Sequence, residues 1–324
     1  MKDCGATVRE PPAWKLNCKI GRGAFGTVFL EKVQRHGIES PELWAVKKIP
    51  RDLPNFPTKQ YQAEIKNLRA LSNHEWFVKF YSSYEDADHV YIAMEYIPIG
   101  DMSKTFVNGY RWNENDTKVV VEQLLHGLAV MHKEGITHRD LKPENIFLYL
   151  VENGTHVLRV KIGDFGTSKH IPLSNASTYL KTTTGTQGYM APEMDDTSIP
   201  KTNRVDIWSL GCILYRMFAG SPLFPTRLGF YRYVMAASSP PLEVKNLDFS
   251  VSCVSFLGDV LQPEPGDRPS AEDCLKKAWI MNKTPGSEYS IGRDLYATLS
   301  EIKLGAPNVH SFSDIVYGCR SGGG

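Results

Sequence analysis

The sequence is poor in cysteine, and its cysteines follow no pattern that would make them structurally decisive. Of the 324 residues, 6 are cysteines. No two of them form a C-x-x-C pair, and none joins a histidine cluster with the spacing of zinc ligands. We therefore expect reduced thiols in an intracellular protein, cytoplasmic or nuclear, rather than a disulfide framework.

The sequence also lacks a long apolar run and an excess of charge of one sign. Its longest apolar-rich stretch, Ile207 to Ala219, is too short to span a bilayer and contains Arg216. Residues 1–12 are charged and have no apolar core, and Lys2 stands where myristoylation needs glycine, so neither a secretory signal nor that lipid is expected. Because 37 basic residues balance 36 acidic ones, we expect no nucleic acid and no membrane among the partners.

Hydrophobic periodicity divides the chain into a strand-rich first third and a mostly helical remainder. Strands are expected near residues 24–32, 43–49, 77–84 and 90–96. Between the second and third strands a helical stripe is formed by Tyr61, Ile65, Leu68 and Leu71. After Pro98 a second stripe runs from Val120 to Met131, with Gly135 where a helix C-cap belongs. The pattern predicts an α+β fold with two lobes, a small β-rich lobe with one helix and a larger, mainly α-helical lobe.

The first chemical signal is the glycine-rich segment Gly21-Arg-Gly23-Ala-Phe-Gly26-Thr-Val28. Glycines let a backbone turn tightly and approach phosphate oxygens without a Cβ in the way. An ordinary hairpin turn or a dinucleotide-binding loop would also fit the glycines. A dinucleotide loop should open a helix, whereas residues 27–30 continue as a strand, so a hairpin over nucleotide phosphates fits better.

A second signal pairs a strand lysine with a helix glutamate. Lys47 ends the run Trp44-Ala-Val-Lys47, and Glu64 lies 17 residues later in the amphipathic helix. Taken singly, each would be read as a solvated surface side chain. Together they fit a cleft lysine that holds the α- and β-phosphates of a nucleotide and a carboxylate that holds the lysine.

The third signal is more specific, because several chemical groups stand in a fixed order. The run His138-Arg-Asp140-Leu-Lys142-Pro-Glu-Asn145 carries a base, a cation and a metal ligand, and a strand pair then leads to Asp164-Phe-Gly166. Phosphoryl transfer needs a group that orients the attacking hydroxyl, cations that spread the phosphate charge, and oxygen ligands for a metal.

These motifs together resemble the eukaryotic serine/threonine protein kinase domain from about Trp14 to Met281. Later motifs of that family are also present: Ala191-Pro192-Glu193, Asp206-Ile-Trp208-Ser-Leu-Gly211 and Asp267-Arg268-Pro269. The resemblance implies a kinase domain at residues 14–281, with an N-lobe at 14–97 and a C-lobe at 98–281. Residues 1–13 would be an N-terminal extension and residues 282–324 a C-terminal tail. The nearest subgroup in appearance is the calmodulin-dependent and checkpoint kinase group.

The resemblance implies that ATP and Mg²⁺ are the cofactors. Asp140 would orient the substrate hydroxyl and accept its proton, and Lys142 would neutralise charge on the transferred phosphoryl group. Asn145 and Asp164 would hold the metal ions. Lys47, paired with Glu64, would position the α- and β-phosphates.

The same alignment places the adenosine pocket. Ile20, Val28, Ala45 and Phe147 would enclose the adenine ring, and an aliphatic residue is more usual at the last position. Glu95 and Ile97 would offer backbone hydrogen bonds, Met94 would lie behind the pocket, and Asp101 would reach the ribose. Plain core packing is the alternative for the apolar members.

Some motif residues are expected to be structural. Four side chains should stack through both lobes: Leu68, Phe80, His138 and Phe165. Glu193 and Arg268 should form a buried ion pair, and Asp206 should brace the backbone at His138 and Arg139.

Two features favour serine and threonine over tyrosine as acceptors, namely Lys142 and the pair Gly185-Thr186. In the family this threonine contacts the catalytic aspartate and lysine. Glu144 and Asp101 resemble carboxylates that receive an arginine upstream of the target, so protein substrates with upstream basic residues are a hypothesis.

Arg139 before the catalytic aspartate suggests control by a phosphate on the activation segment, Asp164 to Glu193. The candidates are Thr182 and Thr183, of which Thr182 aligns best, and an unmodified polar loop is an equal alternative.

Three other functions compete with an active kinase that works as a monomer. A pseudokinase scaffold conflicts with the intact set of Lys47, Asp140, Asn145 and Asp164. A dinucleotide-dependent oxidoreductase would explain the glycines but none of the later motifs. A small-molecule kinase of similar fold would not need the segment from Thr186 to Glu193, which shapes a peptide-binding surface.

Overall fold

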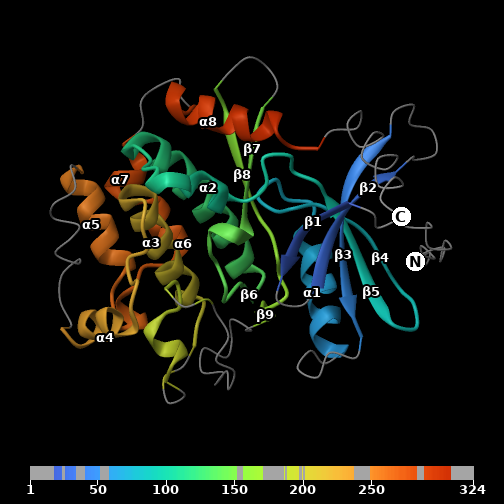
Figure 1. Cartoon of the computed structure of the whole chain (residues 1–324). Coiled ribbons are helices and arrows are strands. Elements are labelled where there is room, and N and C mark those ends of the chain that lie inside the picture. The colour runs from blue at the N-terminus through green and yellow to red at the C-terminus, as the bar shows by residue number, and fades with distance from the viewer. Residues whose placement is uncertain are drawn as a thin grey trace, which may run out of the picture. The chain divides into compact units, whose positions relative to one another are not determined.

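The computed structural model describes residues 18–23, 26–33, 41–51, 58–151, 156–170, 186, 188–196, 199, 201–236, 249–282 and 288–307 (Figure 1). These residues fall into two compact units. The first contains residues up to 61, residues 80–96 and residues from 307 onward. The second contains residues 62–79 and 97–306.

The first unit is built on a five-stranded antiparallel sheet, drawn in blue to cyan in Figure 1. Its strands are β1 (Cys18–Gly23), β2 (Gly26–Val33), β3 (Glu42–Pro50), β4 (Phe80–Glu85) and β5 (His89–Glu95), in the order β1-β2-β3-β5-β4. The expected strands are therefore confirmed in outline. The third was placed three residues too early, because Phe77 makes only an isolated bridge to Ile162 instead of joining β4.

Strand alternation gives this sheet two different faces. Trp44, Val46, Tyr91 and Ala93 form a buried cluster on one face. Aromatic neighbours extend it, since the Tyr84 and Tyr91 rings stack with centroids 4.4 Å apart. Because side chains alternate along a strand, the residues between these positions on β3 and β5 point to the other face. That other face carries Ala45, Lys47 and Met94.

The second unit is mainly helical, as expected. Its helices are most of α1 (Thr58–Leu71) and all of α2 (Glu114–Lys133), α3 (Arg204–Ala219), α4 (Arg227–Met235), α5 (Val251–Val260), α6 (Ala271–Leu275), α7 (Ala278–Met281) and α8 (Arg293–Leu304). The α+β fold class with one β-rich and one helical unit is confirmed. Among the described helices, none is long and apolar enough to cross a lipid bilayer.

Helix α2 begins and ends where capping chemistry predicts. Asn113 accepts a hydrogen bond from the Asp116 backbone N–H at 2.8 Å, which satisfies one of the open donors at the helix start. At the other end Gly135 adopts φ +70°, a conformation that glycine tolerates and that stops the helix. The predicted stripe from Val120 to Met131 is buried along its length.

Helix α3 forms the centre of the second unit and packs against α2 and α5. It is buried on most sides, as its apolar sequence predicts, and the Trp208 side chain is fully buried. The predicted ion pair anchors the neighbouring segment, because the Arg268 guanidinium donates to both Glu193 oxygens at 2.6 and 2.8 Å. Both side chains are fully buried, which makes loss of either partner costly.

Short strands and turns complete the second unit. The hairpin of β7 (Ile146–Leu150) and β8 (Leu158–Ile162) is the predicted strand pair, and β6 (Ile136–Thr137) pairs with β9 (Lys169–His170). Two 3₁₀ turns, η1 (Met102–Gly109) and η2 (Pro143–Asn145), flank β7.

The C-terminal segment from Glu288 to Ala306 is an integral part of the second unit. The Leu158 N–H donates to the Tyr289 carbonyl and the Ile291 N–H donates to the His156 carbonyl, each at 2.9 Å. The rings of His156 and Tyr296 stack with centroids 4.2 Å apart. Helix α8 begins at Arg293, because the preceding residues pair with the chain before β8.

Candidate active site

The backbone that follows β6 is held by one buried carboxylate. Asp206 of α3 accepts the backbone N–H of His138 and that of Arg139, both at 2.9 Å, which confirms the predicted brace. Burial raises the pKa of Asp206, but the opposing hydrogen bonds and charges, first among them His132 at 2.9 Å, hold that pKa below its usual value. This anchoring supports a left-handed φ of +68° at Arg139, a strained conformation for a residue with a Cβ.

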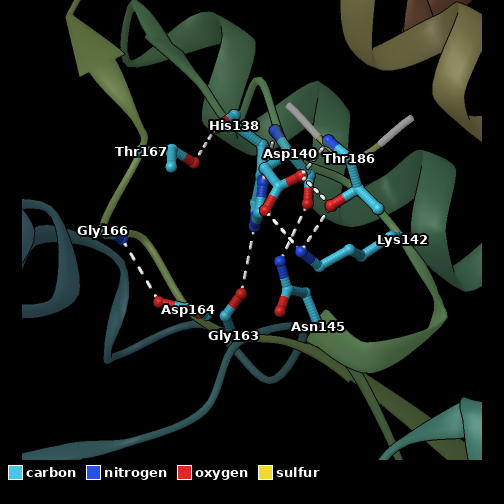
Figure 2. Close-up of polar contacts among 9 residues, drawn as sticks. All are labelled: His138, Asp140, Lys142, Asn145, Gly163, Asp164, Gly166, Thr167 and Thr186. Atoms are coloured by element: carbon cyan, nitrogen blue, oxygen red, sulfur yellow. Dashed lines mark hydrogen bonds and ion pairs between the residues drawn. The ribbon is translucent and has the colours of Figure 1, made fainter. Parts of the chain in front are cut away.

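Asp140 lies at the centre of a compact polar cluster (Figure 2). Its Oδ2 accepts a hydrogen bond from Lys142 Nζ at 2.7 Å. Its Oδ1 accepts two, from the Thr186 backbone N–H at 2.9 Å and from the Thr186 hydroxyl at 2.8 Å. Lys142 Nζ also donates to that hydroxyl, at 2.6 Å. The predicted contact of Thr186 with both residues is confirmed.

Asn145 joins the catalytic loop to the segment before Asp164. Its side-chain Nδ2 donates to the Asp140 carbonyl at 2.8 Å, which turns the amide oxygen away from that carbonyl. Its own carbonyl accepts the Gly163 N–H at 2.9 Å. Asn145 therefore ties the loop that contains Asp140 to the strand end that leads to Asp164.

The Asp164-Phe-Gly segment is fixed on both sides. His138 Nε2 lies 3.0 Å from the Gly163 carbonyl, and the His138 and Phe165 rings have centroids 5.6 Å apart. Asp164 itself has φ +55°, and its Oδ1 accepts the Gly166 N–H at 3.4 Å. His138 therefore packs and orients, as predicted. Arg139 and Asp164 are two of the four non-glycine residues with positive φ in the described part of the chain, and the other two are Asn108 and Tyr289.

Position 163 needs a glycine because neighbouring side chains leave no room for a Cβ atom. A Cβ at this position would lie 2.9 Å from a ring carbon of Phe147 and 3.0 Å from a methyl of Val78. The Phe147 ring thus covers the backbone directly before Asp164. The same residue bridges to Asp101, and the Leu148 N–H donates to the Gly100 carbonyl at 3.0 Å. Phe147, which is predicted to contact the adenine, and Asp101, which is predicted to reach the ribose, therefore lie next to each other in this unit.

Asp101 has a structural task as well. Its Oδ1 accepts the Ser103 N–H at 3.0 Å and so caps η1. Before Asp101, the Gly100 N–H donates to the Ile97 carbonyl at 2.9 Å, which closes a turn from Ile97 to Gly100. Ile97 is buried.

In the sheet unit, the strand register places Val28, Ala45, Lys47 and Met94 on one face. Val28 pairs with Lys47, and Ala45 pairs with Met94, and directly paired residues share a face. Lys47 is 5% exposed although it carries an amine. Gly21 and Gly23 of β1 pair with β2 next to this face, Ile20 lies between them and Lys19, and Glu95 ends β5.

Gly26 is also required by close approach, because a Cβ there would lie 2.3 Å from the Lys48 carbonyl oxygen. No side chain fits at this point, so the glycine-rich turn keeps its backbone against β3. Glu64, in the helical part of the second unit, is 1% exposed. Burying a carboxylate or an amine costs free energy unless the group is paired or hydrogen-bonded, whereas a charged side chain on the surface pays no such cost.

Arg139 is a buried cation with few hydrogen-bond acceptors around it. Its side chain is 7% exposed, and its Nη2 donates to the Thr167 carbonyl. Among the residues that the structure describes, its Nε and Nη1 find no hydrogen-bond acceptor. Burial lowers the pKa of Arg139 to about 10, against a smaller raising effect of Asp206. Thr182 and Thr183 lie outside the described residues.

One contributor to the site was not found from the sequence. His132, in the last turn of α2, lies against Asp206 and so supports the backbone of the catalytic loop from a second side. Its position six residues before His138 carried no recognisable spacing, and only the packing of α2 against α3 reveals it.

The fold and this cluster define a protein kinase domain. The family described as "Protein kinase domain" matches residues 14–280, and the chain belongs to it. Among curated relatives, CDPK-related kinase 8 of Arabidopsis thaliana is 35% identical over 272 residues, which cover 82% of this chain and 43% of the relative. The serine/threonine-protein kinase cds1 of Schizosaccharomyces pombe is 34% identical over 274 residues, with 81% and 57% covered.

An Aurora kinase of Yarrowia lipolytica is 30% identical over 283 residues, with 86% of this chain and 71% of the relative covered. The chain spans about half the length of the first curated relatives that it matches, such as 45% of CDPK-related kinase 4. The resemblance to a kinase domain of the calmodulin-dependent and checkpoint group is confirmed.

Proposed function

We propose that the chain is an active serine/threonine protein kinase that transfers the γ-phosphoryl group of ATP to hydroxyls of protein substrates. The observation that carries the proposal is the cluster of Asp140, Lys142 and Thr186. A carboxylate, an ammonium and a hydroxyl meet there within 2.9 Å of one another. A charged cluster this tight, on a backbone strained at Arg139, is costly for folding and is understandable as catalytic machinery.

In the proposed reaction Asp140 orients the substrate hydroxyl and takes its proton. The hydroxyl oxygen forms a bond to the γ-phosphorus while the bond from that phosphorus to the β-phosphate oxygen breaks, which releases ADP. Lys142 supplies positive charge beside the transferred group. The rate gain comes from positioning and electrostatics, without a phosphorylated enzyme intermediate.

The residues present also fit a divalent metal, which we propose is Mg²⁺. Asn145 spends its amide nitrogen on the Asp140 carbonyl, so its oxygen is turned toward a ligand, and Asp164 adds a carboxylate. Such hard oxygen donors suit Mg²⁺. When bound, the metal would neutralise charge on the phosphates.

For the nucleotide we propose the set predicted from the sequence. Lys47, paired with Glu64, would hold the α- and β-phosphates. The adenosine would lie against the sheet face with Val28, Ala45 and Met94 and against Phe147, with Asp101 at the ribose. The glycine-rich turn at Gly21, Gly23 and Gly26 would cover the phosphates, Ile20 would close the pocket, and Glu95 and Ile97 would bond the ring.

Serine and threonine are the proposed acceptors because Thr186 shares its hydroxyl between the base and the lysine. The test is incubation with γ-labelled ATP, Mg²⁺ and a basic protein, comparing wild type with Asp140→Asn and identifying the phosphorylated amino acid. We expect label on serine or threonine from the wild type alone. Equal label from both proteins would contradict the proposal, and no label from either would favour a pseudokinase.

We also propose control by phosphorylation of the activation segment, at Thr182 before Thr183. The buried Arg139 supports it, because two of its nitrogens lack acceptors among the described residues and a phosphate would supply them. Activity should fall after phosphatase treatment of the wild type. If Thr182→Ala and Thr183→Ala keep the full activity of the untreated wild type, this control does not exist.

Basic residues upstream of the acceptor remain a proposal that rests mainly on Glu144, which is exposed two residues after Lys142. Asp101 spends one oxygen on capping η1, so it contributes less to this idea. A peptide library in which upstream arginine gives no advantage would remove it. We further propose that the protein acts as a monomer inside the cell, which its mass in solution would test.

A further inference from the structure

Arg216 occupies an unusual place in α3. The helix is otherwise apolar along this stretch, yet Arg216 points a guanidinium out of it toward the segment after Thr186. Its Nη1 donates to the Tyr189 hydroxyl, and its Cζ lies 4.7 Å from the centre of the Phe106 ring. A hydroxyl and an aromatic face therefore hold the planar cation in one orientation.

The charge of Arg216 has no counter-charge among the residues that the structure describes. No described carboxylate lies within ion-pair distance of it, and its Nε is buried without a hydrogen-bond acceptor. Arg268 offers a contrast from the same unit, since it is fully buried but matched by both oxygens of Glu193. A half-buried guanidinium with an unused donor is a standing electrostatic cost that a bound anion would relieve.

Arg216 is also connected to the reaction centre by a short path. The Tyr189 N–H donates to the Thr186 carbonyl at 3.1 Å, and the Thr186 hydroxyl donates to Asp140. The Tyr189 carbonyl in turn accepts from Ser209 of α3 at 2.8 Å, which fixes the backbone between them. Arg216 is thus linked through Tyr189 to Thr186, and Thr186 contacts the proposed base Asp140.

The surroundings of Tyr189 show that two opposite charges act at this place. Burial raises the pKa of the Tyr189 hydroxyl to about 12, the Arg216 charge opposes that rise, and the Glu144 charge adds to it. The exposed Glu144 and Arg216 therefore both lie near enough to Tyr189 for their charges to act on its hydroxyl.

We propose that Arg216 forms a substrate subsite for an acidic side chain, an aspartate or glutamate close to the phosphorylated residue. The inference rests on the proposed function and names the class of substrate. A guanidinium can donate two parallel hydrogen bonds to a carboxylate, which an ammonium cannot do in that geometry. The substrate motif would then combine an acidic residue at Arg216 with any basic residue that Glu144 selects. A phosphorylated side chain is the other anion that fits.

The competing explanation is that Arg216 only braces Tyr189. A brace and a subsite differ in one respect: removing a brace lowers activity toward all substrates, whereas removing a subsite changes the preference among them. Arg216→Lys keeps the charge and loses the fork, and Arg216→Glu reverses the charge. Tyr189→Phe removes the hydroxyl contact and leaves the cation, so it serves as the matched control.

The experiment measures kcat/KM on a peptide set around one serine, with Asp, Glu, Asn, Gln, Lys or phosphoserine at each flanking position. For the wild type we expect one position at which Asp or Glu exceeds Asn or Gln about 10-fold, the scale of one charged hydrogen bond. Arg216→Glu should prefer Lys at that position, Arg216→Lys should keep a weaker acidic preference, and Tyr189→Phe should keep it nearly whole. Thermal unfolding confirms that each variant is folded.

The outcomes separate the two proposals. A wild type that phosphorylates the set but prefers no acidic position overturns the subsite alone, as does an acidic preference that survives in folded Arg216→Glu. An Arg216→Glu variant that does not fold leaves the decision to Arg216→Lys, whose acidic preference must be weaker than that of Tyr189→Phe. Preference for phosphoserine alone overturns the carboxylate assignment. A wild type that phosphorylates no peptide and no protein overturns the proposed function and the subsite together.

Discussion

The hydroxyl of Thr186 lies 2.8 Å from Asp140 Oδ1 and 2.6 Å from Lys142 Nζ, so it accepts from the ammonium while it donates to the carboxylate. Thr186 follows Asp140 by 46 positions and Lys142 by 44 positions, so the contact joins two segments that are far apart in the chain. The contact fixes the geometry of the proposed base before any substrate arrives. It also ties the segment after Thr186, which includes Tyr189, to the catalytic loop.

Removing this hydroxyl should reduce catalysis without unfolding the protein. Thr186→Ala loses hydrogen bonds to two charged groups. A loss in the transition state equal to one such bond, about 1.5–3 kcal/mol, lowers kcat roughly 10- to 100-fold, and this is the fall that we expect. Thr186→Ser keeps the hydroxyl and should retain most of the activity. The check is kcat for a protein substrate together with the unfolding temperature; equal activity of Ala and Ser variants would contradict the role.

The buried pair of Glu193 and Arg268 should be needed for stability. Arg268→Met leaves the Glu193 carboxylate buried without its partner, and breaking such a pair costs about 3–5 kcal/mol. Glu193→Gln should cost less, because the amide oxygen can still accept from the guanidinium. Denaturant unfolding measures both, and a folded Arg268→Met protein of unchanged stability would show that the pair does not hold this region.

Asp206 predicts how stability responds to acid. Its pKa in the folded protein is lowered from 3.8, so its contribution is fully present above pH 3.8 and is lost as pH falls through the lower folded value. Asp206→Asn removes the charge at every pH, and we expect it to lose about 2 kcal/mol or more at neutral pH.

The control for this prediction is the pH profile of unfolding between neutral pH and pH 3. The difference in stability between wild type and Asp206→Asn should be constant down to about pH 4 and shrink below it. A difference that grows as the pH falls would contradict the lowered pKa.

The segment beyond the matched kinase domain should behave as part of the fold. Truncation after residue 287 removes the Tyr289 carbonyl that accepts the Leu158 N–H, the stacking of Tyr296 on His156, and the Gly292 N–H that donates to Asp116 Oδ1 at 2.7 Å. We expect a lower unfolding temperature. Truncation after residue 307 keeps all of these contacts, so it is the matched control and should lower that temperature less. An equal effect of the two truncations would contradict the role of these contacts.

Much of the site could be predicted from the sequence, because motif spacing carries local chemistry. Asp140, Lys142 and Asn145 are close in the chain, so their meeting needs only one loop, and Thr186 was placed beside them by its position before Tyr189. The helix ends were also readable, since Asn113 and Gly135 are capping residues whose effect is local.

Other features depend on packing between distant segments and could not be read in this way. His132 supports Asp206 only because α2 lies against α3. Tyr289 pairs beside β8 after more than 100 intervening residues, and nothing in the sequence of the predicted tail indicated this pairing. Arg216 was noticed merely as a break in an apolar run, and its contacts with Tyr189 and Phe106 became visible only with the tertiary structure.

The central claim of the proposed function is that Lys47 and Asp164 bind Mg·ATP and that Asp140 acts in the transfer step. The most direct test is the affinity for Mg·ATP of wild type, Lys47→Met, Asp164→Asn and Asp140→Asn, each measured by calorimetry and paired with phosphoryl transfer. We predict weaker nucleotide binding for Lys47→Met and Asp164→Asn, and near wild-type binding for Asp140→Asn with transfer reduced about 100-fold or more. Unchanged Mg·ATP affinity in both Lys47→Met and Asp164→Asn, with transfer intact, would contradict the claim.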